Sequence, residues 1–213
     1  MEGKEGVVKT EAEAAVKTKL VRDGYEGLFP TRVANREEFL TLLDEKLFEE
    51  AGEWMSGRKK PDGEYDPNDR DPMELADVLE VIETILSSKG RGVKYSTTSL
   101  RKITESIKGF KKTVSGLLKD RDTFDGTFVA WIKDWEDNHN FKDLAKVYEL
   151  TLAAGVISSP PASQMVLENL RLDKKKKLGG FSKGLISGPD LEQTKEAPVP
   201  LQTAGGWRRF FRK

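Results

Sequence analysis

Apolar residues at helical spacing in two long segments are the feature that most constrains the fold of this chain. In the first segment, residues 37–55, they recur at steps of three and four: Leu40, Leu43, Leu47, Ala51 and Trp54. In the second, which begins at Met73, they are Leu75, Val78, Leu79, Ile82, Ile85 and Leu86. This period is typical of amphipathic helices, and almost no segment has the alternation of a strand. The sequence therefore predicts an all-α fold in which these two helices, joined by the breaker-rich loop 56–72, pack antiparallel.

Further helical segments follow along the chain. We predict one helix over residues 101–118, a segment over 127–141 after a break at Asp125-Gly126, and helices over 143–155 and 163–177, the last stopping at Gly179-Gly180. Four aromatic residues at helical spacing are expected in the core, with a base-stacking wall or a lid as the alternative: Phe124, Phe128, Trp131 and Trp135. The ends are polar. Residues 1–17 are predicted to be a flexible extension, and residues 188–213 a disordered basic tail that ends in WRRFFRK.

The residue composition excludes several kinds of chemistry. The chain has no cysteine and one histidine, so disulfides, thiol catalysis and the usual ligand sets of zinc are excluded. The histidine, His139, lies between two asparagines and is predicted to be a turn residue. Basic and acidic residues both number 36, so the net charge gives no reason to expect a polyanionic partner. Since no apolar run is long enough to span a bilayer, we expect a cytoplasmic protein without a transmembrane segment.

Five acidic residues occupy matched positions on the two long helices: Glu49, Glu50 and Glu53 on the first, and Glu74 and Asp77 on the second. At about 100° per residue, Glu50 and Glu53 lie on one flank of the apolar stripe, and Glu49 points farther outward. The second pair also lies on a flank. Antiparallel packing would gather the four flank carboxylates in a semi-buried cluster, whose repulsion a divalent cation relieves. Oxygen ligands without histidine or cysteine point to Mg²⁺, with Mn²⁺ as the alternative.

The same acids also have a simpler interpretation. In a chain with 36 acidic residues, pairs of glutamates on helices are common, and most of them face solvent. The spacings ExxE and ExxD are individually weak signals. Periodicity alone therefore leaves a metal site and a solvated acidic face as alternatives.

Four motifs in order carry a resemblance to a known family. They are KLVRD (19–23), EExxE (49–53), ExxD (74–77) and GGF (179–181). Their order resembles that of the phosphoribosyl-ATP pyrophosphohydrolase-like branch of the MazG-like all-α nucleoside triphosphate pyrophosphohydrolases. The resemblance covers residues 18–87 and 164–187. It implies a MazG-like catalytic domain over residues 18–187, an antiparallel helical bundle with an inserted helical hairpin at about 88–145.

The resemblance also implies an activity and the residues that perform it. Members of the family hydrolyse a nucleoside triphosphate between the α and β phosphates, giving a monophosphate and pyrophosphate. By this resemblance Glu50, Glu53, Glu74 and Asp77 bind Mg²⁺, and Glu49 assists a further ion or orients the attacking water. Magnesium in such a site neutralises phosphate charge and lowers the pKa of bound water. The candidates for holding the phosphates are Lys19, Arg22, Lys174, Lys177 and Lys183.

The chain departs from the family pattern at two places. Gly24-Tyr25-Glu26 follows Arg22-Asp23 where the family has a lysine, an isoleucine and a proline, and Leu178 stands where an arginine is usual. The resemblance therefore names neither the base nor the pathway, and phosphoribosyl-ATP is not the preferred substrate. Residues 143–155 echo residues 74–86 with Lys146 in the place of Asp77, either as the resumption of an interrupted helix or as a degenerate copy without metal ligands.

The partners follow from the same reasoning. We expect a nucleotide substrate and a homo-oligomer, because a short helical bundle buries little area alone, and the insertion is expected to pack on the catalytic helices or on a second subunit. The partner of the tail is unknown. The alternative hypothesis is a non-catalytic helical adaptor derived from such an enzyme, acting through the insertion and the basic aromatic tail.

Overall fold

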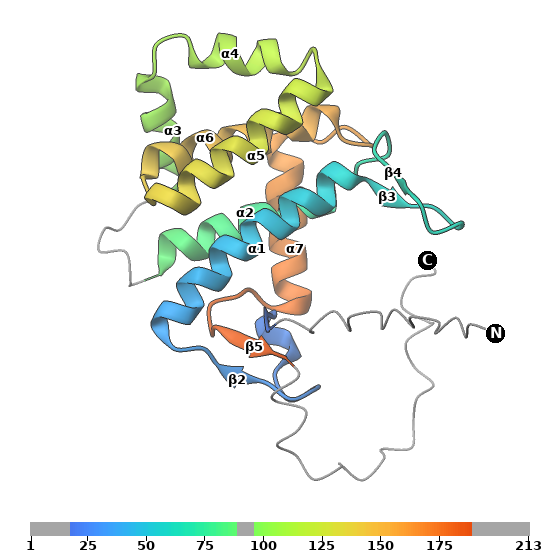
Figure 1. The fold of residues 1–213 in the computed structure, drawn as a ribbon, viewed down its shortest axis with the longest axis vertical. Coiled ribbons are helices and arrows are strands. Elements are labelled where there is room, and N and C mark those ends of the chain that lie inside the picture. The colour runs from blue at the N-terminus through green and yellow to red at the C-terminus, as the bar shows by residue number, and fades with distance from the viewer. Residues whose placement is uncertain (1–17, 89–95, 189–213) are drawn as a thin grey trace, which may run out of the picture.

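The computed structural model describes residues 18–88 and 96–188, and in this part of the chain seven α-helices pack against one another beside five very short strands (Figure 1). The helices are α1 (Arg36–Ser56), α2 (Pro72–Ser87), α3 (Thr97–Ser106), α4 (Phe110–Leu117), α5 (Arg121–Asn138), α6 (Phe141–Ala154) and α7 (Gln164–Leu178). The strands are β1 (Lys19–Leu20), β2 (Arg32–Val33), β3 (Arg58–Lys59), β4 (Tyr65–Asp66) and β5 (Leu185–Ser187). The predicted all-α class is confirmed.

The hairpin of α1 and α2 has the two helices that the periodicity predicts. Asn35 begins α1 with a capping box, in which its side chain accepts from the Glu38 backbone N–H and the Glu38 carboxylate accepts from the Asn35 N–H. Asp71 caps α2, with Pro72 at its first position. The helices run antiparallel and pack along their lengths (Figure 1). This packing places the acid-bearing flank of α1 beside the acid-bearing flank of α2.

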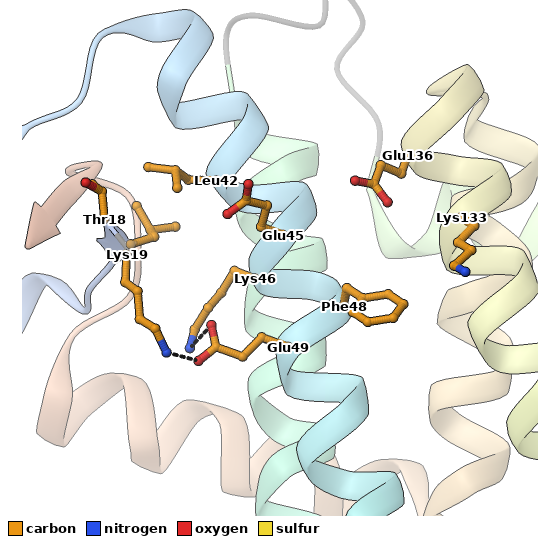
Figure 2. Close-up of a pocket in the computed structure, with 10 residues that line it drawn as sticks. Thr18, Lys19, Leu42, Glu45, Lys46, Phe48, Glu49, Lys133 and Glu136 are labelled. Atoms are coloured by element: carbon orange, nitrogen blue, oxygen red, sulfur yellow. Dashed lines mark hydrogen bonds and ion pairs between the residues drawn. The ribbon is translucent and has the colours of Figure 1, made fainter. Parts of the chain in front are cut away.

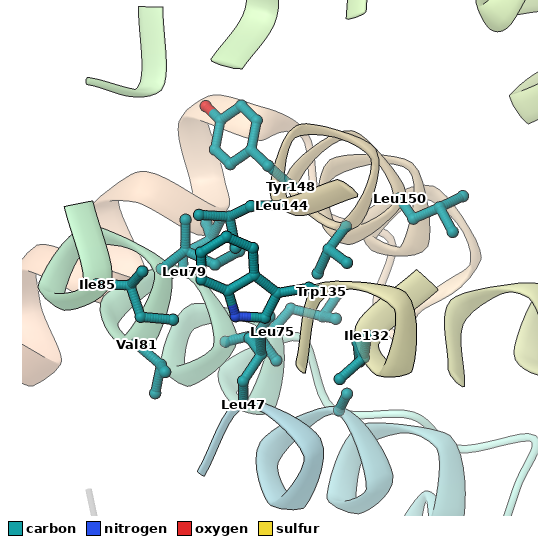
Figure 3. Packing of buried hydrophobic residues seen from close by; sticks show 14 of the residues in the cluster. Leu47, Leu75, Leu79, Val81, Ile85, Ile132, Trp135, Leu144, Tyr148 and Leu150 are labelled. Atoms are coloured by element: carbon teal, nitrogen blue, oxygen red, sulfur yellow. The ribbon is translucent and has the colours of Figure 1, made fainter. Parts of the chain in front are cut away.

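The aromatic residues of the insertion lie in the core. Phe124, Phe128 and Trp135 are fully buried, and Figure 3 shows Trp135 near the middle of the apolar cluster. Helix α5, which lies within the insertion, packs on α1, as expected; α6, most of which lies beyond residue 145, packs on α2. Trp131 is partly buried against the same cluster. Helix α6 also packs on α5.

Two predicted helix boundaries are wrong. The single helix expected over 101–118 is divided into α3 and α4, because Gly109 takes a left-handed backbone with φ of 77° and ends the helical path. The break expected at Asp125-Gly126 is absent, and α5 runs through both residues from its N-cap Asp120, whose side chain accepts from the backbone N–H groups of Asp122 and Thr123.

The strands form a small sheet that the sequence did not predict. The strand order is β1-β5-β2 with antiparallel pairing, and a separate hairpin pairs β3 with β4. Leu20 of β1 pairs with Ile186 of β5. This sheet ties the segment around Arg22 to the segment that follows α7, and thereby joins two motifs that lie about 160 residues apart.

Some predictions fall outside the described residues. These are the extension over 1–17, the tail from residue 189 onward, including WRRFFRK, and residues 89–95 at the start of the insertion. Within residues 18–88 and 96–188, no helix combines the length and the apolar character that a membrane span requires.

Candidate metal centre

Three carboxylates from two helices converge in the structure. One oxygen of each of Glu50, Glu74 and Asp77 lies within 4.8 Å of the others. Glu50 is 4% exposed and Asp77 is 5% exposed, whereas Glu74 is partly exposed. Because Glu74 and Asp77 are three residues apart on α2, they share a face, and α1 supplies Glu50 from the opposite side. In the described part of the chain, this is the one group of three acids or histidines close enough to share a cation.

Basic side chains already neutralise much of this charge. Arg22 donates to Asp77 Oδ1, and Lys174 donates to Asp77 Oδ2. Lys46 Nζ lies 2.6 Å from Glu50 Oε1. Lys46 was not among the predicted site residues, although its spacing of four residues from Glu50 on a helix is a signal that could have found it.

Contacts from the KLVRD and GGF motifs position Arg22. Its guanidinium donates to the Gly179 carbonyl oxygen at 2.8 Å and lies 4.8 Å from the centre of the Phe181 ring. A side-chain carbon on Gly24 would overlap the Leu178 carbonyl, and Gly179 has a φ of 76°. The end of α7 can therefore approach the turn after Arg22 closely because glycine stands at both positions. This explains why Gly24 follows Arg22-Asp23 here.

A cavity of about 340 Å³ lies over the three carboxylates. It is lined by the three acids and, among others, by Lys19, Arg22, Lys46, Glu53, Lys174 and Phe181. Three of the five predicted phosphate-binding residues thus share a cavity with the acids.

The remaining predicted site residues lie outside the group of three carboxylates, and three of them also lie outside the cavity. Glu53 lines the cavity but is exposed and outside the group of three. Glu49 does not line it, and its carboxylate lies 3.2 Å from Lys19 Nζ and 3.4 Å from Lys46 Nζ. Lys177 is exposed on α7 and does not line the cavity. Lys183 also lies outside it and pairs with Glu26, because the turn after Phe181 directs it away.

Burial changes the acid–base properties of the cluster. The pKa of Glu50 is raised to about 7, chiefly by desolvation; Lys46 opposes this rise, and the negative charges of Asp77 and Glu53 add to it. Desolvation also raises the pKa of Glu74. Burial lowers the pKa of Lys46, but the carboxylates of Glu50 and Glu49 outweigh this and raise it overall. Added positive charge at the centre would therefore stabilise the ionised carboxylates of Glu50 and Glu74.

The stability of the metal-free protein should fall as pH rises through this range. Between pH 4.5, the ordinary pKa of a glutamate, and about pH 7, the folded chain binds a proton on Glu50 that the unfolded chain has released. The free energy of unfolding should therefore decrease across this window, by on the order of 3 kcal/mol from Glu50. Thermal unfolding in chelator at pH 5 and pH 8 measures the change. In Glu50→Gln the pH dependence should be smaller, and an unchanged dependence would contradict the assignment.

Two other buried acids have structural partners. Asp44 accepts from the Trp135 indole at 3.0 Å and lies 2.8 Å from His139 Nε2, which ties α1 to the end of α5. His139 has a φ of 48° at the C-cap of α5, so the predicted turn is confirmed. Glu80 accepts from Arg171 at 2.9 Å. Neither pair lines the cavity over the three carboxylates.

Comparison of the chain with protein-family models, with curated proteins and with solved structures gives no match. The MazG-like resemblance therefore stays a prediction that rests on the four motifs. The support for a function comes from the geometry of the cavity and its charged side chains.

Proposed function

We propose that the chain is a Mg²⁺-dependent nucleoside triphosphate pyrophosphohydrolase that cleaves between the α and β phosphates. One observation carries the proposal. The carboxylates of Glu50, Glu74 and Asp77 meet within 4.8 Å beneath a cavity that is also lined by Lys19, Arg22 and Lys174. Acids that hold a hard cation and bases that hold phosphates are the two parts that phosphoryl chemistry requires in one place.

The donor set fits a magnesium ion. All three groups are carboxylates, which are the protein ligands that Mg²⁺ prefers. In an octahedral site with metal–oxygen distances of about 2.0–2.1 Å, the oxygens lie about 2.9–4.2 Å apart. The observed limit of 4.8 Å is close to this range, so small side-chain adjustments suffice. Bound Mg²⁺ would neutralise phosphate charge and activate water.

The basic residues of the cavity then have a second set of partners. In the substrate-free arrangement, Arg22 and Lys174 bind Asp77, and Lys19 pairs with Glu49. When Asp77 is shared with a cation, the ammonium of Lys174 can donate to a phosphate oxygen instead. Glu53, exposed at the cavity, is the carboxylate available to accept a proton from the attacking water.

The neutralised state of the cluster favours a second candidate function. Arg22, Lys46 and Lys174 supply three positive charges to Glu50 and Asp77 without any metal. A buried network of this kind can serve a structural role alone. The second candidate is therefore the non-catalytic adaptor, in which the pairs of Asp77 hold α2, α7 and the segment around Arg22 together.

An assay of a nucleotide panel separates the two functions. The protein is incubated with canonical and oxidised or deaminated nucleoside triphosphates, with Mg²⁺ or with chelator, and the phosphate products are identified. We expect pyrophosphate and a nucleoside monophosphate from at least one nucleotide, with Mg²⁺ required. Release of orthophosphate and a diphosphate would contradict cleavage at the α–β position, and no turnover of any nucleotide would favour the adaptor.

A further inference from the structure

A second cavity adjoins the metal centre on the outer side of α1. Its volume is about 400 Å³, within the range of about 300–1,000 Å³ that small-molecule sites occupy. We call it the outer pocket, and define it by Lys19, Leu42, Lys46, Phe48, Lys133 and Glu136, which line it. Lys19 and Lys46 line the cavity over the three carboxylates as well. Both ammonium groups pair with Glu49, so a ligand that extends from one cavity into the other across them replaces Glu49 as their partner.

The outer pocket contains an exposed aromatic ring between charged groups. Figure 2 shows Phe48 directed from α1 toward α5, with Lys133 and Glu136 on α5 facing it. Phe48 is 40% exposed, although the other aromatic residues near this end of α1 and α5, such as Trp135, are buried in the core. A ring left accessible beside a donor and an acceptor has the features of a site for a flat, polar heterocycle.

The insertion supplies two of the ten residues that line this pocket. Lys133 and Glu136 both lie on α5, whereas the carboxylates of the metal centre come from α1 and α2. Lys133 and Glu136 are both exposed, so their polar groups can face a ligand. The insertion thus adds recognition groups beside a centre to which it contributes no ligand.

We propose that the outer pocket binds the nucleoside part of the substrate, with the base against Phe48 and the phosphates passing Lys19 and Lys46 to the metal centre. This inference rests on the proposed function. Phe48 is then the residue that gives the base its stacking surface, and Lys133 and Glu136 offer one donor and one acceptor to its polar edge. The α5 helix determines which nucleosides are accepted.

Binding measurements with and without a nucleoside test this assignment. The probes are the α,β-methylene triphosphates of adenosine, guanosine, cytidine and uridine, and inorganic tripolyphosphate, each titrated into the full chain with Mg²⁺ in a calorimeter. In the unaltered protein, at least one nucleotide should bind about ten-fold more tightly than tripolyphosphate, because stacking on an aromatic ring has about this value. Phe48→Ala should remove this difference and leave tripolyphosphate binding within about two-fold.

Control variants keep the result interpretable. Tyr65→Ala removes an aromatic ring of comparable exposure, 56%, from the β3–β4 hairpin and should change neither affinity. Phe48→Leu keeps an apolar side chain and should lose most of the nucleotide preference if stacking is the cause. Equal binding of nucleotides and tripolyphosphate by the unaltered protein would overturn the nucleoside pocket and leave the phosphate site standing. If no probe binds with Mg²⁺, the proposed function fails and this inference fails with it.

Discussion

Replacing Asp77 with asparagine should reduce Mg²⁺-dependent pyrophosphate release on the order of a thousand-fold or more. Asp77 is 5% exposed and offers one oxygen to the group of three carboxylates while both its oxygens receive donors from Arg22 and Lys174. Asparagine keeps the shape but removes the charge that a divalent cation and its neighbours require. The initial rate on the best nucleotide of the panel, at saturating Mg²⁺, measures the loss.

A matched control separates this effect from general damage. Asp143 on α6 is also a buried aspartate, and its Oδ1 lies 2.6 Å from Lys146 Nζ, but it does not line the cavity. Asp143→Asn should retain activity within about three-fold, in line with the small effects of changes away from a site. Circular dichroism and the thermal midpoint establish that both variants fold. Activity of Asp77→Asn equal to that of Asp143→Asn would exclude Asp77 from the reaction.

Replacing Arg70 with alanine should lower the free energy of unfolding by about 3 kcal/mol. Arg70 is 2% exposed and donates to both carboxylate oxygens of Asp125 on α5, at 2.7 and 2.6 Å. Its guanidinium also lies 4.6 Å from the centre of the Trp54 ring. Alanine would leave a void beside Trp54 and remove the link between the loop before α2 and the insertion.

Denaturation by urea and by heat measures this effect. For a domain of this size the loss corresponds to a decrease of roughly 6–12 °C in the thermal midpoint. Arg58→Ala serves as control, because the Arg58 side chain is 46% exposed and its pairs with Asp69 and Asp71 are at 3.4 and 3.2 Å. Exposed pairs of this kind contribute about 0–1 kcal/mol. Equal destabilisation by the two changes would show that the buried contacts of Arg70 have no special role.

The parts of the fold with long apolar periodicity were predictable from the sequence. Helices α1 and α2 extend over 21 and 16 residues, and each begins at a capping residue that the sequence displays. The sheet could not be predicted, because strands of two or three residues are too short to show an alternation. The division of residues 101–118 into two helices depends on the left-handed backbone of Gly109. The sequence does not reveal this division, because the apolar stripe continues past the glycine.

The candidate site was predictable to the extent that it depends on helix faces. Glu50, Glu74 and Asp77 converge because their positions on α1 and α2 and the antiparallel packing require it. The exposure of Glu53 and the displacement of Lys177 and Lys183 depend on how α7 and the turn after it sit, which helical periodicity does not determine. The outer pocket depends on the docking of α5 against α1, a contact between segments about 85 residues apart.

Titration of the metal-free protein with Mn²⁺, followed by electron paramagnetic resonance of the free ion, tests the central claim most directly. Unaltered protein should bind at least one Mn²⁺ per chain, and Mg²⁺ should compete for the same site. Glu74→Gln should weaken this binding by at least about ten-fold, because it removes one of three ligand carboxylates while leaving the Arg22 and Lys174 contacts of Asp77 in place. Equal Mn²⁺ binding by the two proteins, or none by either, would contradict a metal centre formed by Glu50, Glu74 and Asp77.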